Sequence, residues 1–169
     1  MTIGISLVGA GSFARMHLEA YRADPRAKVL WICDPDIERA KKYAAEYDIP
    51  HITADYEESL LDPHVKCVDI TAPNFLHKPV SIRAMEAGKA VLCEKPMALN
   101  ATEAREMMEA SRRLKQKLFV KYHQRFDLAH QKAKQMMDSG EFENPVLGFV
   151  TLFANHLPSM LNPNHWRGI

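Results

Sequence analysis

The pattern Gly9-x-Gly11-x-x-Ala14 follows an apolar run, Ile3–Val8, and precedes a helix-like segment. Near-continuous apolar runs of this length are typical of strands that are buried on both faces of a parallel sheet. Gly9 permits a tight turn, Gly11 lets the backbone approach a pyrophosphate, and Ala14 is small enough for close helix–strand packing. The pattern therefore predicts a strand–turn–helix unit that binds a dinucleotide. The alternative is a glycine turn that binds nothing.

The helix after this loop is expected to begin near Ser12. Its first turn, with Ser12 and Phe13, would offer unpaired main-chain N–H groups and the positive end of the helix dipole. Both features favour an anionic ligand at the loop. We therefore count Ser12 and Phe13 with the two glycines as cofactor-binding candidates.

Asp34 follows the apolar run Lys28–Cys33 and stands 25 residues after Gly9. A carboxylate at this place accepts hydrogen bonds from ribose hydroxyls and repels a 2′-phosphate. The sequence therefore favours NAD over NADP. Arg39 is close enough to Asp34 to weaken that preference, which leaves NADP possible. Alternatively, Arg39 is a solvated charge on the surface of the following helix.

Short apolar runs alternate with helix-like segments along the first two thirds of the chain. This rhythm predicts an α/β fold, a Rossmann doubly wound parallel sheet with both faces covered by helices. The expected strands are Ile3–Val8, Lys28–Cys33, Val65–Thr71, Ala90–Cys93 and Leu118–Tyr122, with a weak extra strand at His51–Thr53. The expected helices are Ser12–Ala23, Ile37–Tyr47, Tyr56–Leu61, Phe75–Ala87 and Ala101–Lys117.

Local signals mark several helix ends. Gly88 is expected to end one helix in the left-handed conformation. Asn100 and Glu103 resemble a capping box at the start of the next helix, whose buried face would contain Ala104, Met107, Met108 and Leu114.

The character of the chain changes after about residue 124. Asp127 is expected to cap a helix that Gly140 ends, and Val146–Asn155 reads as a long strand. A lone strand cannot satisfy its own backbone, so it must join further chain. We expect residues 1–123 to form an NAD(P)-binding Rossmann domain and residues 124–169 to begin an incomplete α+β C-terminal domain.

Composition excludes several classes of protein. A net charge of +1 provides no basic surface for nucleic acid, and no apolar run is long enough for a membrane span. The N-terminus runs straight into the strand-like segment Ile3–Val8, so we do not expect a secretory signal. Cys33, Cys67 and Cys93 match no zinc spacing and are expected as buried, reduced thiols, so we expect no metal site and a cytoplasmic protein.

Two further motifs narrow the interpretation to a family. The first is the segment Thr71–His77, Thr-Ala-Pro-Asn-Phe-Leu-His, and the second is Cys93-Glu94-Lys95-Pro96. With the glycine loop, the preceding segment Ala87–Leu92 and the later Arg125-Phe126, these motifs resemble the Gfo/Idh/MocA family of glucose–fructose oxidoreductase and inositol dehydrogenase. The resemblance implies an N-terminal domain for NAD or NADP and a C-terminal domain that covers the substrate and mediates homo-oligomers. It also implies hydride transfer between the nicotinamide and a sugar or polyol.

The resemblance also implies roles for single residues. Lys95 corresponds to the active-site lysine, which would bind the nicotinamide ribose and the substrate hydroxyl and lower the pKa of that hydroxyl. Glu94 would lie on the nicotinamide side. Pro96 would set the exit of the strand, and the bond before it is often cis in the family.

Other residues are assigned to the cofactor in the same way. Thr71, Pro73 and Asn74 would line its adenine–ribose and pyrophosphate side. His77 either contacts the ligand or packs at the start of a helix. Trp166 and Arg167 resemble a pair near the nicotinamide.

The family's Asp-x-x-x-His pair, which completes acid–base catalysis, has no counterpart after Lys95. We therefore expect a truncated form of an oxidoreductase. Two alternatives stay open: a non-catalytic dinucleotide sensor, and another reaction on the same scaffold, such as biliverdin reduction or NAD-dependent glycoside cleavage. Lys95 favours an enzyme over a sensor, because a sensor does not need a lysine aimed at the cofactor crevice.

Overall fold

The computed structural model describes residues 2–141 of the chain, which fall into two compact units. The first unit runs to Lys121 and the second begins at Tyr122. We describe each unit separately.

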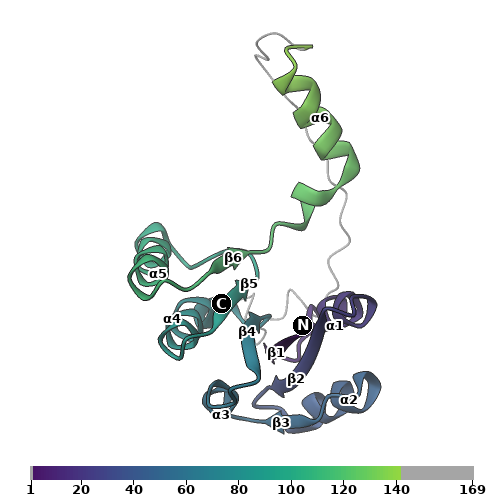
Figure 1. The fold of residues 1–169 in the computed structure, drawn as a ribbon, viewed down its shortest axis with the longest axis vertical. Helices are drawn as coiled ribbons and strands as arrows, with labels where there is room; N and C mark the ends of the chain where they lie inside the picture. Colours follow the sequence, from purple (N-terminus) through teal and green to yellow (C-terminus); the bar gives the residue numbers. More distant parts are fainter. Residues whose placement is uncertain (1, 142–169) are drawn as a thin grey trace, which may run out of the picture. The chain divides into compact units, whose positions relative to one another are not determined.

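The first unit is built on a six-stranded parallel sheet in the order β3-β2-β1-β4-β5-β6 (Figure 1). The strands are β1 (Ile3–Val8), β2 (Ala27–Cys33), β3 (His51–Thr53), β4 (Val65–Ile70), β5 (Ala90–Cys93) and β6 (Leu118–Val120). The strand order reverses between β1 and β4, and open sheets of this kind bind ligands beyond the carboxyl ends of the strands at that point. The predicted Rossmann sheet, including the short strand β3, is confirmed.

Helices cover both faces of the sheet, as Figure 1 shows. They are α1 (Ala14–Ala23), α2 (Ile37–Tyr47), α3 (Tyr56–Leu60), α4 (His77–Glu86) and α5 (Ala101–Leu114). One buried cluster joins β1 and β2 to α1 and α2 through residues such as Leu7, Leu18 and Ile32. A second joins β4 and β5 to α3, α4 and α5. Successive residues of β1 serve opposite faces, because Leu7 lies in the first cluster and Val8 in the second.

Several helix boundaries differ from the prediction because local turns replace the expected first or last turn. Helix α1 begins at Ala14, not at Ser12. The expected helix Phe75–Ala87 divides into a 3-10 turn, η1 (Asn74–Leu76), and α4. Helix α5 stops at Leu114 because Lys115 takes a left-handed conformation, with φ of 55°.

Other predictions for this part of the chain are partly correct. Gly88 follows α4 with φ of +76°, as expected. Asn100 accepts the N–H of Glu103, but the Glu103 carboxylate accepts the N–H of Leu99 instead of completing a box. On α5 Met108 is exposed, and Ala110 is buried beside Met107 instead.

Further boundaries lie one or two residues from their predicted places, among them the start of β2, at Ala27 rather than at Lys28, and the end of α4, at Glu86 rather than at Ala87. Strand β6 ends at Val120 rather than at Tyr122, and β4 ends at Ile70 rather than at Thr71. Helix α3 ends at Leu60, one residue early. All three cysteines are free, and Cys33 and Cys93 are buried, whereas Cys67 is only partly buried.

The second unit contains a 3-10 turn, η2 (His123–Phe126), and α6 (Leu128–Asp138). Asp127 caps α6 by accepting the N–H groups of Ala129 and His130, and Gly140 follows with φ of +80°. The predicted helix is therefore confirmed, whereas Val146–Asn155 and the Trp166-Arg167 pair lie outside the described residues. Within residues 2–141, no helix has the length and apolar character that crossing a membrane requires.

Candidate functional site

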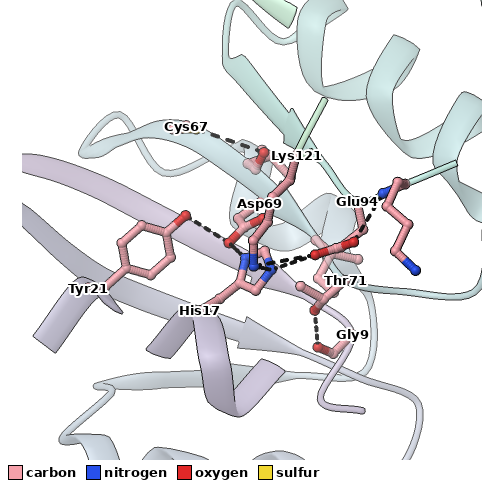
Figure 2. Close-up of polar contacts among 11 residues, drawn as sticks. Gly9, His17, Tyr21, Cys67, Asp69, Thr71, Glu94 and Lys121 are labelled. Carbon is pink, nitrogen blue, oxygen red and sulfur yellow. Dashed lines mark hydrogen bonds and ion pairs between the residues drawn. The ribbon is translucent and has the colours of Figure 1, made fainter. Parts of the chain in front are cut away.

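The glycine turn lies where β1 ends, and it is held closely against the end of β4. Gly9 has φ of +103°, and a Cβ there would lie 2.6 Å from the nitrogen of Ala72. The Gly9 N–H donates to the carbonyl of Cys33 at 2.8 Å, and the Thr71 hydroxyl donates to the carbonyl of Gly9 at 2.6 Å (Figure 2). Only glycine fits at position 9, because both the conformation and the space exclude a side chain.

Gly11 is different, because a Cβ built there meets no atom within 4 Å. The N-terminus of α1, which follows, has no side-chain cap and no acidic residue in its first turn. Helix N–H groups and an uncompensated dipole beside an open, side-chain-free position form a cradle for an anion. The residues present therefore fit the pyrophosphate of a dinucleotide.

Asp34 links the glycine loop to the end of β2. Its carboxylate is almost fully buried and accepts the N–H of Ala10 at 2.7 Å, the N–H of Asp36 at 2.8 Å and the Arg39 guanidinium at 2.7 Å. The bond to Ala10 was not foreseen from the sequence. It means that Asp34 shapes the loop as well as standing where a ribose is expected. Arg39 stays about half exposed beside it.

His77 is only 1% exposed, and both of its ring nitrogens face main-chain carbonyls. Nδ1 lies 2.7 Å from the oxygen of Pro96, and Nε2 lies 3.1 Å from that of Ala72. The ring therefore joins the loop after β4 to the loop after β5. This geometry favours packing over ligand contact, the two roles between which the sequence left a choice. Pro73 and Asn74, on the same loop, are partly exposed.

Lys95 follows β5 with an exposed side chain, and its ammonium lies 5.3 Å from the centre of the Phe13 ring. The structure thus brings the lysine and the glycine loop together. The Lys95-Pro96 peptide is cis, as the resemblance implied. The N–H of Lys95 donates to Oε2 of Glu94 at 3.1 Å, so the two residues are tied through main chain and side chain.

A buried polar network lies behind Glu94, and no sequence motif identified it (Figure 2). His17 of α1 stands at its centre and is 3% exposed. Its Nδ1 lies 2.6 Å from Oδ2 of Asp69, and its Nε2 lies 3.0 Å from Oε1 of Glu94 and 2.8 Å from Nζ of Lys121. The Tyr21 hydroxyl donates to the same Asp69 oxygen at 2.7 Å.

The sheet places these groups together through main-chain bonds just beyond the strand ends. The Glu94 N–H donates to the carbonyl of Ile70, and the Lys121 N–H donates to that of Cys93. Two polar residues in apolar surroundings were the signal from which the network could have been suspected. His17 adjoins Leu18 on the buried side of α1, and Asp69 interrupts the apolar run of β4. Because buried charged groups are normally paired, the burial of each residue predicts a polar partner, but the sequence does not identify which residue that partner is.

The surrounding charges shift the pKa values of the network. Burial opposes a charged His17, but hydrogen bonds to Asp69 and Glu94 outweigh it and raise the pKa of His17 to about 9. Burial likewise opposes a charged Glu94, but its bonds to His17 and to the Lys95 N–H, with the charge of Lys121, lower the pKa of Glu94 to about 2. Protonated His17 and Lys121 then balance the carboxylates of Asp69 and Glu94.

Within the described residues 2–141, no group of three or more histidine, cysteine, aspartate or glutamate side chains could hold a metal ion.

Comparison with known proteins agrees with this geometry. The sequence model of a family described as an oxidoreductase family with an NAD-binding Rossmann fold matches residues 3–122. The curated 1,5-anhydro-D-fructose reductase of Ensifer adhaerens is 32% identical over 161 residues, which are 95% of this chain and 47% of that protein.

Two solved structures show the same likeness. An NAD binding oxidoreductase from Klebsiella pneumoniae is 36% identical, with a TM-score of 0.79 over 86% of this chain and 41% of that chain. The WlbA dehydrogenase of Chromobacterium violaceum, solved with NADH and UDP-GlcNAcA, is 31% identical, with a TM-score of 0.80 over 84% of this chain and 41% of that one. The chain spans less than half the length of each of these three proteins.

Proposed function

Because the chain belongs to the Gfo/Idh/MocA family of oxidoreductases, we propose that it is the dinucleotide-binding part of an NAD-dependent enzyme acting on a sugar or polyol. The observation that carries the proposal is the open position at Gly11 beside the uncapped N-terminus of α1. We propose that Gly9, Gly11, Ser12 and Phe13 hold the pyrophosphate there. NAD, when bound, supplies hydride exchange at its nicotinamide.

Asp34 and Arg39 support a preference for NAD that is not absolute. The Asp34 carboxylate already accepts three hydrogen bonds, and its remaining lone pair would accept a ribose hydroxyl. A 2′-phosphate would meet this buried negative charge. Arg39 gives the site a half-exposed cation with which such a phosphate could pair. We therefore expect NADH to bind more tightly than NADPH, with NADPH binding still measurable.

We propose Lys95 as the catalytic residue contributed by this chain. Its ammonium is exposed at the carboxyl end of β5, on the same side as the glycine loop. An ammonium in that place donates a hydrogen bond to a substrate oxygen and stabilises negative charge as it develops there. Glu94, Pro96, Thr71, Pro73, Asn74 and the Trp166-Arg167 pair stay proposed neighbours of the cofactor.

The proposed substrate class rests on the similar proteins. Their sugar-related names support a sugar or polyol substrate. We also propose that residues 124–169 begin a substrate domain through which copies of the protein associate. The three free cysteines suit a reducing compartment, which supports a cytoplasmic protein.

Replacing Gly11 by valine should abolish dinucleotide binding without unfolding the chain. The side chain enters open space in the free protein, but it occupies the place proposed for the pyrophosphate. We expect the Kd for NADH, measured by the fluorescence of the bound cofactor, to rise by about 100-fold or more, equivalent to about 3 kcal/mol. An unchanged urea midpoint is the control for folding. A folded variant with unchanged affinity would contradict the proposed cradle.

Replacing Asp34 by asparagine should narrow the preference for NADH over NADPH by about tenfold. The amide oxygen keeps an acceptor for the Ala10 N–H, while the charge that opposes a 2′-phosphate is lost. The matched control is Asp36→Asn, two residues later, where the carboxylate is half exposed and caps α2. Titration of both variants with both cofactors gives the ratios. Equal affinities for NADH and NADPH in the unmodified chain would overturn the preference.

A further inference from the structure

The His17 network connects the helix of the glycine loop to the segment that contains Lys95. His17 lies on α1, four residues after the Phe13 ring over which the Lys95 ammonium stands. Glu94 receives a bond from each side, with Oε1 facing His17 Nε2 and Oε2 accepting the Lys95 N–H. The orientation of the Lys95 main chain is therefore linked, through one carboxylate, to an imidazole on α1.

The Nε2 atom of His17 has two competing partners. Oε1 of Glu94 is 3.0 Å away and is an acceptor, whereas Nζ of Lys121 is 2.8 Å away and is a donor. A protonated Nε2 can donate only to Glu94, and a deprotonated Nε2 can accept only from Lys121. Nδ1 faces Asp69 in both cases and keeps its proton.

We propose that His17 is a positioning residue: protonated, it holds Glu94 and thereby the Lys95 main chain, and deprotonated, it pairs with Lys121 and loses its own hydrogen bond to Glu94, which keeps only the ion pair with Lys121 on that side. Charge balance supports the protonated form near neutral pH. Asp69 and Glu94 are both buried, and Lys121 alone would leave one negative charge unpaired. The role of Lys95 in this inference rests on the proposed function, but the coupling itself does not.

Several other titratable groups surround His17. Titratable and charged side chains face the network from every element packed against it: Tyr21 from α1, Cys67 and Asp69 from β4, Cys93 and Glu94 from β5 and its end, and Lys121 after β6. Burial raises the pKa of each thiol to about 12. Burial and Asp69 raise the pKa of the Tyr21 hydroxyl as well. The two thiols and the Tyr21 hydroxyl therefore stay neutral while His17 loses its proton.

The test is a pH titration of the isotope-labelled, cofactor-free chain followed by NMR. We expect the His17 ring signals and the Lys95 amide signal to change together, with one midpoint near pH 9. The direct field of the His17 charge also reaches the Lys95 amide, so the response that counts is the part that disappears when Glu94 is replaced by glutamine. A Lys95 amide that stays constant while His17 titrates, or a His17 that is already neutral at pH 7, would overturn the proposal.

Two variants should shift the His17 midpoint in opposite directions. Glu94→Gln removes the acceptor charge, so the midpoint should fall and the Lys95 amide should stop responding. Lys121→Met removes the nearby cation and the alternative donor, so the midpoint should rise. The matched control is Glu103→Gln, which alters a carboxylate that accepts the Leu99 N–H in the same way and should change neither curve. A shift of both midpoints in one direction would contradict the competition for Nε2.

A separate measurement distinguishes this inference from the proposed function. NADH affinity, read from cofactor fluorescence on either side of the midpoint, should fall several-fold as the His17–Glu94 hydrogen bond is lost. Absence of NADH binding at both pH values would overturn the proposed function, while the amide titration would still decide the role of His17. Binding that is equal at both pH values would overturn the link between His17 and the cofactor crevice.

Discussion

The Gly9→Ala variant is expected to lose about 4 kcal/mol of unfolding free energy, a large part of the 5–15 kcal/mol that is typical of a domain. Part of the loss is backbone strain, because Gly9 has φ of +103° and such strain costs about 1–3 kcal/mol. The remainder is crowding. The new Cβ would lie 2.6 Å from the nitrogen of Ala72 and 2.8 Å from the carbonyl carbon of Thr71, and overpacking costs about 1–3 kcal/mol.

Urea denaturation followed by circular dichroism measures the loss. The matched control is Gly11→Ala, the same substitution two residues later, where the Cβ meets no atom within 4 Å. We expect its midpoint to stay close to that of the unmodified chain. Equal midpoints for the two alanine variants would show that the end of β4 can move away from position 9, contrary to the crowding described above.

Elements that depend on local sequence were predicted well. The apolar runs of β1 and β5 and the pattern of α2 gave the observed bounds, because each pattern lies within the element that it specifies, and the weak extra strand expected at His51–Thr53 matches β3. The predictions failed at element ends. There, a left-handed Lys115 or a 3-10 turn at Asn74–Leu76 is decided by one or two residues that compete with the helix.

The buried network escaped prediction because its members are far apart in the chain. His17 meets Asp69 across 52 positions, Glu94 across 77 and Lys121 across 104. Their proximity follows from the register of β4, β5 and β6 and from the packing of α1, none of which a local pattern contains. Glu94 and Lys95 were found only because a motif marks them. The sequence assigned Asp34 to the cofactor, but only the structure revealed its hydrogen bond to the Ala10 N–H.

The His17→Leu variant is expected to lose about 3–5 kcal/mol of unfolding free energy near pH 6, because removing one partner leaves buried charges uncompensated. Asp69 would keep only the Tyr21 hydroxyl, and its Oδ1 has no partner within the described residues. The control is Arg83→Leu, which removes the cation of the half-exposed pairs with Glu57 and Glu86 and should cost about 0–1 kcal/mol.

The pH dependence of stability separates the charge of His17 from its packing. The pKa of His17 is raised from 6.5 to about 9 by folding, so its contribution is complete below pH 6.5 and is lost as the pH rises through 9. The pKa of Glu94 is lowered from 4.5 to about 2, so its contribution is present above pH 4.5 and is lost as the pH falls towards 2. The unmodified chain should therefore be most stable between these limits.

The alkaline decline should amount to about 3 kcal/mol, from about 1.4 kcal/mol for each pH unit of the shift. Urea midpoints measured at intervals across the alkaline range would show it. In His17→Leu the decline should be absent, since the group that loses its proton is gone, so the two chains should converge as the pH rises. A His17→Leu chain that lost stability in parallel with the unmodified chain would assign the decline to other groups and would leave His17 with a packing role.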